Sequence, residues 1–221
     1  MRLSWVVVVP AKGNPGGKSR LGALPERAAL AEAFALDTVS VALGSPRVLG
    51  VFVVTGDVAL GAALELLGAV IVPEARGADR AGAPSEDPLN AAIRQGAAAA
   101  RASFPDAPLA VVTGDLPALR ATDLTKTLDL AAAYALAMVP DAAGTGTTAL
   151  LVRSGLPPAL LFGPGSRAAH EAAGYVPLEV AARSTIRRDV DTAEDLDVAH
   201  GLGLGPYSRA VLQEPVGPAP Q

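Results

Sequence analysis

The chain contains no cysteine among its 221 residues. This absence excludes disulfide bonds and cysteine-ligated metal centres, and it favours a reducing compartment, so we expect a cytoplasmic protein. Histidine occurs only twice, as His170 and His200, and both lie in stretches where a structural or solvated role is favoured over catalysis. Any metal site would therefore use oxygen ligands, which favours Mg²⁺.

Charged residues are also scarce, at 18%, and the formal net charge is −4 with a pI near 5.2. This balance argues against a general binder of nucleic acid or of anionic membranes, although a local basic pocket is compatible with it. The N-terminal apolar run ends at Pro10, far short of the roughly 20 residues that span a bilayer, and a signal peptide would need a longer run and a cleavage site. We expect neither nucleic-acid nor membrane partners, and nothing in the sequence indicates an oligomeric state.

Apolar residues make up 50% of the chain, enough for a substantial core. Apolar runs rich in β-branched residues predict buried strands at Trp5–Val9, Val51–Val54, Ala69–Val72, Leu109–Val112, Leu136–Val139 and Thr148–Val152. Between them, stretches rich in Ala and Leu predict helices at Glu26–Leu43, Val58–Leu67, Leu89–Ala102 and Thr122–Ala133, the last with Thr122 as its N-cap. This alternation predicts an α/β fold with a mostly parallel central sheet, whose ligands gather at the carboxyl ends of the strands.

The regular alternation of predicted strands and helices ends after residue 139. Glycine-rich turns are expected at Gly144–Thr148 and Phe162–Ser166, followed by a short helix, two strands and a last helix at Arg167–Ala173, Val176–Val180, Thr185–Val190 and Thr192–Leu202. No linker or internal repeat divides the chain. We therefore predict one domain over residues 1–206 and a partly disordered C-terminal tail over residues 207–221.

A glycine-rich basic loop, Gly13-Asn14-Pro15-Gly16-Gly17-Lys18-Ser19-Arg20-Leu21, directly follows the first predicted strand. Its main-chain N–H groups and the side chains of Lys18 and Arg20 could hold a polyphosphate. A Walker A loop is disfavoured, because Lys12 stands where its first glycine is required and Pro25 would fall inside the following helix. A flexible surface loop with solvated charges is the remaining alternative.

Three aspartates form the second candidate feature. Asp115 follows a predicted strand; taken alone it would be a turn or helix-capping residue, but its place at a carboxyl end favours a functional role. Asp189 and Asp191 are two positions apart, with Val190 between them, so in an extended segment both point to one side and could share a cation. Asp191 also fits a capping box with Glu194, and it could serve as both cap and ligand. The three carboxylates together suggest a Mg²⁺ site.

Asn90 lies at the start of the helix predicted at Leu89–Ala102. Its amide could read a base or a ribose, or it could only cap the helix or lie on the surface. The residues themselves leave both interpretations open.

These features occur in an order that resembles a known family. The motifs are Lys18-Ser19-Arg20-Leu21, Leu89-Asn90-Ala91-Ala92, Gly114-Asp115-Leu116-Pro117, Gly146-Thr147, Phe162-Gly163-Pro164-Gly165-Ser166 and Asp189-Val190-Asp191-Thr192. They resemble the phosphoenolpyruvate or 2-phospho-L-lactate guanylyltransferases of coenzyme F420 biosynthesis, over roughly Val6 to Gly203. The resemblance implies a single-domain nucleotidyltransferase fold, Rossmann-like and of glycosyltransferase-A type, that uses GTP and Mg²⁺.

The resemblance also implies roles for individual residues. Lys18 and Arg20 would hold the triphosphate and act in catalysis with Asp115, and Asn90 would lie near the nucleoside. Mg²⁺ would be held by Asp115, Asp189 and Asp191, and the phosphorylated three-carbon acid by Thr147, Gly163 and Ser166. The chain departs from the expected pattern at Gly13–Gly17 and at Thr148, so either Thr147 or Thr148 could contact the acid. A nucleotidyltransferase for another acceptor and a non-catalytic nucleotide-binding protein are the alternatives.

Overall fold

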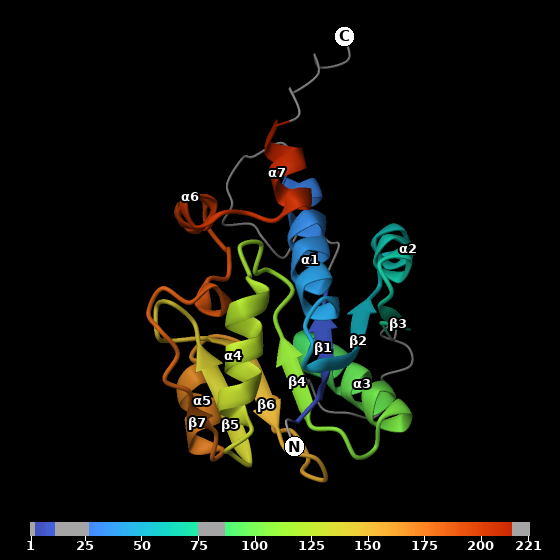
Figure 1. Cartoon of the computed structure of the whole chain (residues 1–221), viewed down its shortest axis with the longest axis vertical. Helices are drawn as coiled ribbons and strands as arrows, with labels where there is room; N and C mark the ends of the chain where they lie inside the picture. The colour runs from blue at the N-terminus through green and yellow to red at the C-terminus, as the bar shows by residue number, and fades with distance from the viewer. Residues whose placement is uncertain (1–2, 12–26, 75–86, 214–221) are drawn as a thin grey trace.

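The computed structural model describes residues 3–11, 27–74 and 87–213 (Figure 1). Its strands are β1 (Trp5–Pro10), β2 (Val48–Thr55), β3 (Val70–Pro73), β4 (Leu109–Val112), β5 (Leu136–Pro140), β6 (Thr147–Val152) and β7 (Val176–Pro177). They form one sheet in the order β3-β2-β1-β4-β6-β5-β7. Only β6 runs antiparallel to its neighbours among the described strands. The predicted α/β fold with a mostly parallel sheet is confirmed.

Helices cover both faces of this sheet. They are α1 (Arg27–Leu43), α2 (Val58–Leu66), α3 (Pro88–Ser103), α4 (Ala121–Ala131), α5 (Ser166–Ala172), α6 (Ala193–Leu202) and α7 (Pro206–Gln213). No described helix has the length and apolar character needed to cross a membrane.

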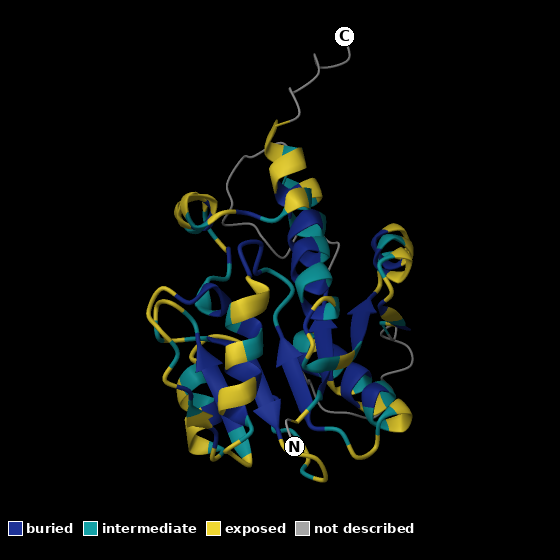
Figure 2. Cartoon of the chain, viewed as in Figure 1, coloured by how far each residue is buried: buried dark blue, intermediate teal, exposed yellow. Residues whose placement is uncertain are grey.

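The alternation of side chains along β1 explains why the strand is apolar throughout. Trp5, Val7 and Val9 pack with α1, α2 and α4 in one hydrophobic cluster. Val6 and Val8 point the other way and pack with α3 in a second cluster. Both faces of the strand are therefore buried, as Figure 2 shows for the centre of the sheet.

A third hydrophobic cluster joins the start of α1 to α6 and α7. In Figure 1 these two helices lie beyond the sheet, at the end to which the arrows of β1, β2 and β4 point. Asp37 in α1 fixes this arrangement, because its carboxylate accepts hydrogen bonds from Tyr207 N at 3.0 Å and Ser208 N at 2.9 Å. Helix α7 occupies the first part of the segment for which the sequence predicts a tail, and residues 214–221 lie outside the described residues.

Three local predictions are wrong. The strand expected at Thr185–Val190 is a 3-10 turn at Thr185–Arg187 followed by irregular chain. Helix α4 begins at Ala121 with Arg120, not Thr122, at the N-cap position. The capping box of α6 lies one residue later than the sequence suggests, with Thr192 and Asp195 as its pair, so Asp191 is not the cap.

Candidate active site

Asp115 lies in a turn that is held from two sides. Gly114 passes close to the end of β1, because a Cβ at this position would be 2.8 Å from the carbonyl oxygen of Pro10. The main-chain N–H of Leu116 donates to Thr38 Oγ1 at 3.2 Å, and this threonine belongs to α1. The turn is therefore fixed between the carboxyl end of β1 and a helix of the core.

The structure brings Asp115 next to the segment that carries Asp189 and Asp191. The main-chain N–H of Val190 donates to the carbonyl oxygen of Asp115 at 3.0 Å, and the Val190 side chain is fully buried. Two acidic segments that are more than 70 residues apart in sequence therefore meet in space. The sequence predicts an extended conformation for the segment of Asp189 and Asp191, but this segment is irregular in the structure.

The pKa of Asp189 is shifted by its burial and by neighbouring acids. Its pKa is raised to about 7, first because the carboxyl group is buried and then because of the charges of Asp115, Asp191 and Asp141. Like charges that share a poorly solvated region disfavour the ionised form, and a cation would reverse that effect. Burial and the charges of the three neighbouring aspartates therefore act in the same direction on the pKa of Asp189.

The acids do not by themselves form a preassembled metal centre. Among residues 3–11, 27–74 and 87–213, no group of three or more His, Asp or Glu side chains is arranged to hold a metal ion. Mg²⁺ commonly uses only one or two protein carboxylates and completes its shell with water and substrate phosphates. The oxygen donors present therefore fit a Mg²⁺ ion bound together with a nucleotide.

Asp141 is an acidic residue that the sequence analysis missed. It directly follows β5, and its carboxylate accepts hydrogen bonds from Thr145 N at 2.9 Å and Gly146 N at 2.8 Å. These bonds close the glycine-rich turn before β6. A signal for it was present, because Asp141 follows a predicted strand just as Asp115 does.

The segment from Thr185 to Asp191 is fastened to the sheet and to α4. Asp123 Oδ2 accepts hydrogen bonds from both Thr185 N and Thr185 Oγ1, each at 2.7 Å. Arg187 donates to the carbonyl oxygen of Pro140 at 3.2 Å and to that of Asp141 at 2.8 Å. These contacts fix the approach to the acids, and no sequence pattern predicted them.

Burial alone would raise the pKa of Asp123. Its hydrogen bonds with Thr185 and Ser184 and the charge of Arg120 outweigh that effect, so the pKa lies below its ordinary value. Asp123 is therefore ionised at neutral pH and is an anchor for the irregular segment.

Thr147, Gly163 and Ser166 come together around α5. Arg167 N donates to the carbonyl oxygen of Thr145 at 3.2 Å, and Ser166 N donates to that of Gly163 at 3.0 Å. Gly163 has a φ of 137°, a conformation that favours glycine. The three residues implied for acceptor binding thus lie at the start of β6, in the turn before α5 and at the first position of α5.

A bulge decides which of the two neighbouring threonines faces α5. Pro140 pairs with Thr147 and Val139 pairs with Ala149, so Thr148 is the extra residue. Thr147 Oγ1 lies 3.0 Å from His170 Nδ1, whereas Thr148 Oγ1 donates to the carbonyl oxygen of Val139 at 3.4 Å.

Asn90 is buried, and both groups of its amide are engaged by one residue. Its Nδ2 donates to the carbonyl oxygen of Phe162 at 3.0 Å, and its Oδ1 accepts from Phe162 N at 2.9 Å. This pairing ties α3 to the loop that carries Gly163. The role of Asn90 near a nucleoside stays a prediction, as do those of Lys18 and Arg20, which lie outside the described residues with the rest of the basic loop and its Walker A alternative.

A family model described as "Guanylyl transferase CofC like" matches residues 5–214 of the chain. The chain belongs to this guanylyltransferase family. The match extends from the first residue of β1 to just beyond α7, so it includes every described residue of the site.

Two relatives of this guanylyltransferase chain are similar to it over most of their length. A phosphoenolpyruvate guanylyltransferase from Streptomyces scabiei (strain 87.22) is 47% identical, with 94% of this chain and 95% of that protein covered. One from Streptomyces coelicolor (strain ATCC BAA-471 / A3(2) / M145) is 44% identical, with 95% and 96% covered.

The chain also shares its fold with the solved structure of a more distant protein. A crystal structure of 4-diphosphocytidyl-2C-methyl-D-erythritol synthase matches with a TM-score of 0.59 and 14% identity, covering 91% of this chain and 99% of that one. At this identity the likeness concerns the fold alone. It supports the single-domain nucleotidyltransferase-like architecture expected from the sequence.

Proposed function

We propose that this guanylyltransferase transfers GMP from GTP to phosphoenolpyruvate and releases pyrophosphate. The observation that carries the proposal is the hydrogen bond from Val190 N to the carbonyl oxygen of Asp115, which joins the two acidic segments. Relatives that are 47% and 44% identical and bear the name phosphoenolpyruvate guanylyltransferase support the choice of acceptor.

In the proposed reaction, an oxygen of the acceptor phosphate attacks the α-phosphorus of GTP. A new P–O bond forms while the bond from the α-phosphorus to the bridging oxygen breaks, and that oxygen leaves with pyrophosphate. No covalent enzyme intermediate is required, so the protein contributes by positioning the two anions and offsetting their charge. Lys18 and Arg20 would hold the triphosphate through charge-assisted hydrogen bonds.

The acceptor would bind on the Thr147 side of the site. The hydroxyl of Thr147 and the main-chain N–H groups of Gly163 and Gly165 would be suitable donors for a carboxylate or a phosphate. Phosphoenolpyruvate and 2-phospho-L-lactate differ mainly in the shape of one carbon, and such differences are worth only about 1–3 kcal/mol. We therefore expect 2-phospho-L-lactate to be the second-best acceptor.

Mg²⁺ is the proposed cofactor, and one or two of the candidate ligands Asp115, Asp189 and Asp191 would hold it, with water and phosphate oxygens completing its shell. When bound, it would stabilise the negative charge that develops on the transferred phosphoryl group and the leaving pyrophosphate. The main chain of Asp115 is held in its turn by the contacts of Gly114 and Leu116, so its carboxylate extends from a fixed point of the backbone.

The product would be a diester of guanosine diphosphate, which could donate its acid moiety to the alcohol of a deazaflavin. We propose, on the family resemblance, that it serves coenzyme F420 biosynthesis in the cytoplasm.

A substrate panel tests the proposed function. The purified full chain is incubated with Mg²⁺, one nucleoside triphosphate and one of three acids (phosphoenolpyruvate, 2-phospho-L-lactate or 3-phosphoglycerate), and the products are identified by mass. We expect pyrophosphate and a guanylylated enolpyruvyl product as the dominant pair. If a different acid gives the main adduct, the acceptor is wrong; GDP with orthophosphate would instead favour the Walker-type alternative, and no turnover would remove the nucleotidyltransferase assignment.

A further inference from the structure

His170 is a fully buried histidine at the centre of the acceptor side of the site. It belongs to α5, and its two ring nitrogens contact different parts of the chain, Thr147 at the start of β6 and Leu161 in the loop before Gly163. The reaction proposed above gives this ring no chemical task. Its two buried polar contacts therefore need another explanation.

The hydrogen bonds determine which nitrogen of His170 carries the proton. The main-chain N–H of Leu161 donates to Nε2 at 3.1 Å, so Nε2 accepts and bears no hydrogen. Burial lowers the pKa of His170 to about 4, against a smaller opposite effect of a hydrogen bond with the Ser166 backbone, so the ring is neutral at neutral pH. The single ring proton is therefore on Nδ1.

That proton sets the orientation of the Thr147 hydroxyl. Nδ1–H of His170 donates to Thr147 Oγ1 at 3.0 Å, so the threonine oxygen is an acceptor there and its own proton points elsewhere. Thr147 Oγ1 donates to Met138 Sδ at 3.8 Å, and a thioether is a weak acceptor. An anionic oxygen of an acceptor acid would be a much stronger partner.

The imidazole has little freedom to turn. Phe162 and Tyr175 stand edge-on against it, with ring centroids at 5.1 Å and 5.4 Å. Phe162 is itself fixed, because its main chain makes two hydrogen bonds to the amide of Asn90. The imidazole, which belongs to α5, therefore connects β6 with the loop of Gly163.

We infer that His170 is a positioning residue for the acceptor acid, acting through Thr147 and the Leu161–Gly163 loop. By donating from Nδ1 it presents the Thr147 hydroxyl as a hydrogen-bond donor, and by accepting at Nε2 it holds the loop that carries Gly163 beside it. The inference rests on the proposed function, since it assigns His170 to the acceptor half of that same site. It assigns no contact between His170 and the substrates.

Three substitutions of His170 separate positioning from packing. His170→Phe keeps a ring between Phe162 and Tyr175 but removes the hydrogen bonds of the imidazole, including those with Thr147 and Leu161. His170→Asn restores a donor at the place of Nδ1, and His170→Gln restores only an acceptor near Nε2. We expect His170→Phe and His170→Gln to raise the KM for phosphoenolpyruvate about ten- to hundredfold, the size that the loss of a hydrogen bond to a charged group suggests.

The same variants should leave the KM for GTP within about twofold of wild type, and His170→Asn should recover most of the affinity for phosphoenolpyruvate. His200→Gln is the matched control, because His200 is the other histidine and is exposed on α6. Nitrogen NMR of the wild-type histidine side chains, without ligands, gives a readout that does not depend on activity. It should show His170 with a proton on Nδ1 and none on Nε2.

The outcomes are distinguishable. If wild type releases no pyrophosphate with any acid, the proposed function fails and the inference fails with it. If wild type is active but the KM for phosphoenolpyruvate is unchanged in His170→Phe, or rises together with the KM for GTP, only the positioning role is wrong. A protonated Nε2 in the NMR spectrum would also overturn the positioning role.

Discussion

Asp115 is the residue through which the two halves of the acidic site are joined. Its carbonyl oxygen receives the N–H of Val190, and the charge of its carboxylate raises the pKa of Asp189. Both effects come from one turn, which Gly114 allows to lie against the end of β1. A substitution that alters only the carboxylate of Asp115 therefore tests its charge while leaving the contacts of the turn in place.

Asp115→Asn should reduce turnover at least about a hundredfold and leave thermal unfolding near that of wild type. The amide keeps the shape of the side chain but removes the negative charge that a hard cation prefers, and the lost charge stabilisation amounts to several kcal/mol. The measurement is pyrophosphate release at limiting Mg²⁺.

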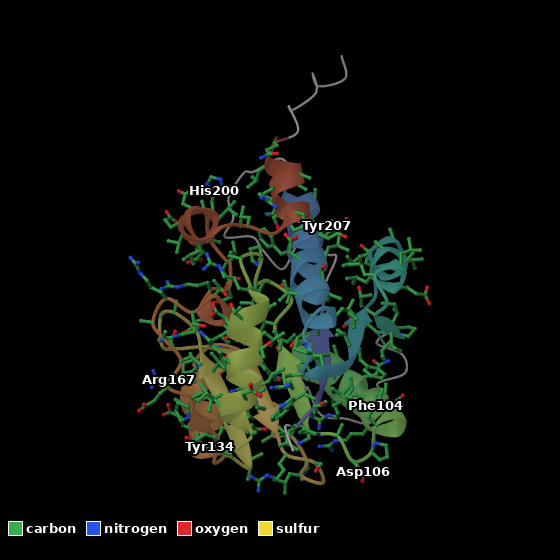
Figure 3. All side chains as sticks on the ribbon, in the orientation of Figure 1. Phe104, Asp106, Tyr134, Arg167, His200 and Tyr207 are labelled. Atoms are coloured by element: carbon green, nitrogen blue, oxygen red, sulfur yellow. The ribbon has the colours of Figure 1, made fainter. Side chains whose placement is uncertain are left out.

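The matched control is Asp106→Asn, at an exposed aspartate that Figure 3 labels at the end of the molecule away from α6 and α7. This variant should behave like wild type. Near-normal turnover of Asp115→Asn under the same conditions would mean that Asp115 holds no metal.

At the scale of elements, α3 shows how close packing can reverse an intrinsic preference. Helix propensity alone predicts that replacing a helical glycine by alanine adds up to about 1 kcal/mol of stability. For Gly96 in α3, however, a Cβ would lie 2.6 Å from both Val8 Cγ1 and Val54 Cγ2. The helix would have to move off the sheet to make room.

Gly96→Ala should therefore lower the free energy of unfolding by about 1–3 kcal/mol, the usual cost of overpacking. Gly201→Ala is the matched substitution, because Gly201 lies in α6 and a Cβ added there would meet no heavy atom within 4 Å outside its own turn of helix. It should be neutral or stabilising. Urea denaturation of both variants tests the pair, and equal effects at the two sites would contradict the packing argument.

At the scale of the whole molecule, His170 makes stability depend on pH. The pKa of this side chain is about 4 in the folded protein and 6.5 in its ordinary state. Below pH 6.5 the unfolded chain binds a proton that the folded chain takes up only near pH 4. The contribution of the neutral His170 to the free energy of unfolding is therefore fully present above pH 6.5 and is lost as the pH falls toward 4.

Between about pH 7 and pH 4.5, wild type should lose about 2–3 kcal/mol more of its unfolding free energy than His170→Phe, since one pKa unit corresponds to about 1.4 kcal/mol. Urea denaturation at the two pH values measures this difference. His200→Gln should keep the wild-type pH dependence. Parallel losses in wild type and His170→Phe would show that His170 titrates normally in the folded protein.

The sequence by itself determined the α/β class and the position of the central strands. Trp5–Val9 and Leu109–Val112 are short runs that are apolar at every position, a pattern typical of a strand buried on both faces, and both are strands of the sheet. The same pattern located Asp115, because the carboxyl end of a parallel strand is known once the strand itself is known. The family resemblance rests on motifs whose order can be identified directly in the sequence.

Only the tertiary structure decided how the remaining site residues are arranged, because their geometry depends on partners far away in sequence. Thr185–Val190 has the composition of a strand, yet Asp123 captures the N–H and the hydroxyl of Thr185, and the segment turns instead. Thr147 faces His170 because a bulge at Thr148 shifts the register of β6 against β5. Local propensity cannot predict such contacts, because each one joins residues that are far apart in sequence and come together only when the chain folds.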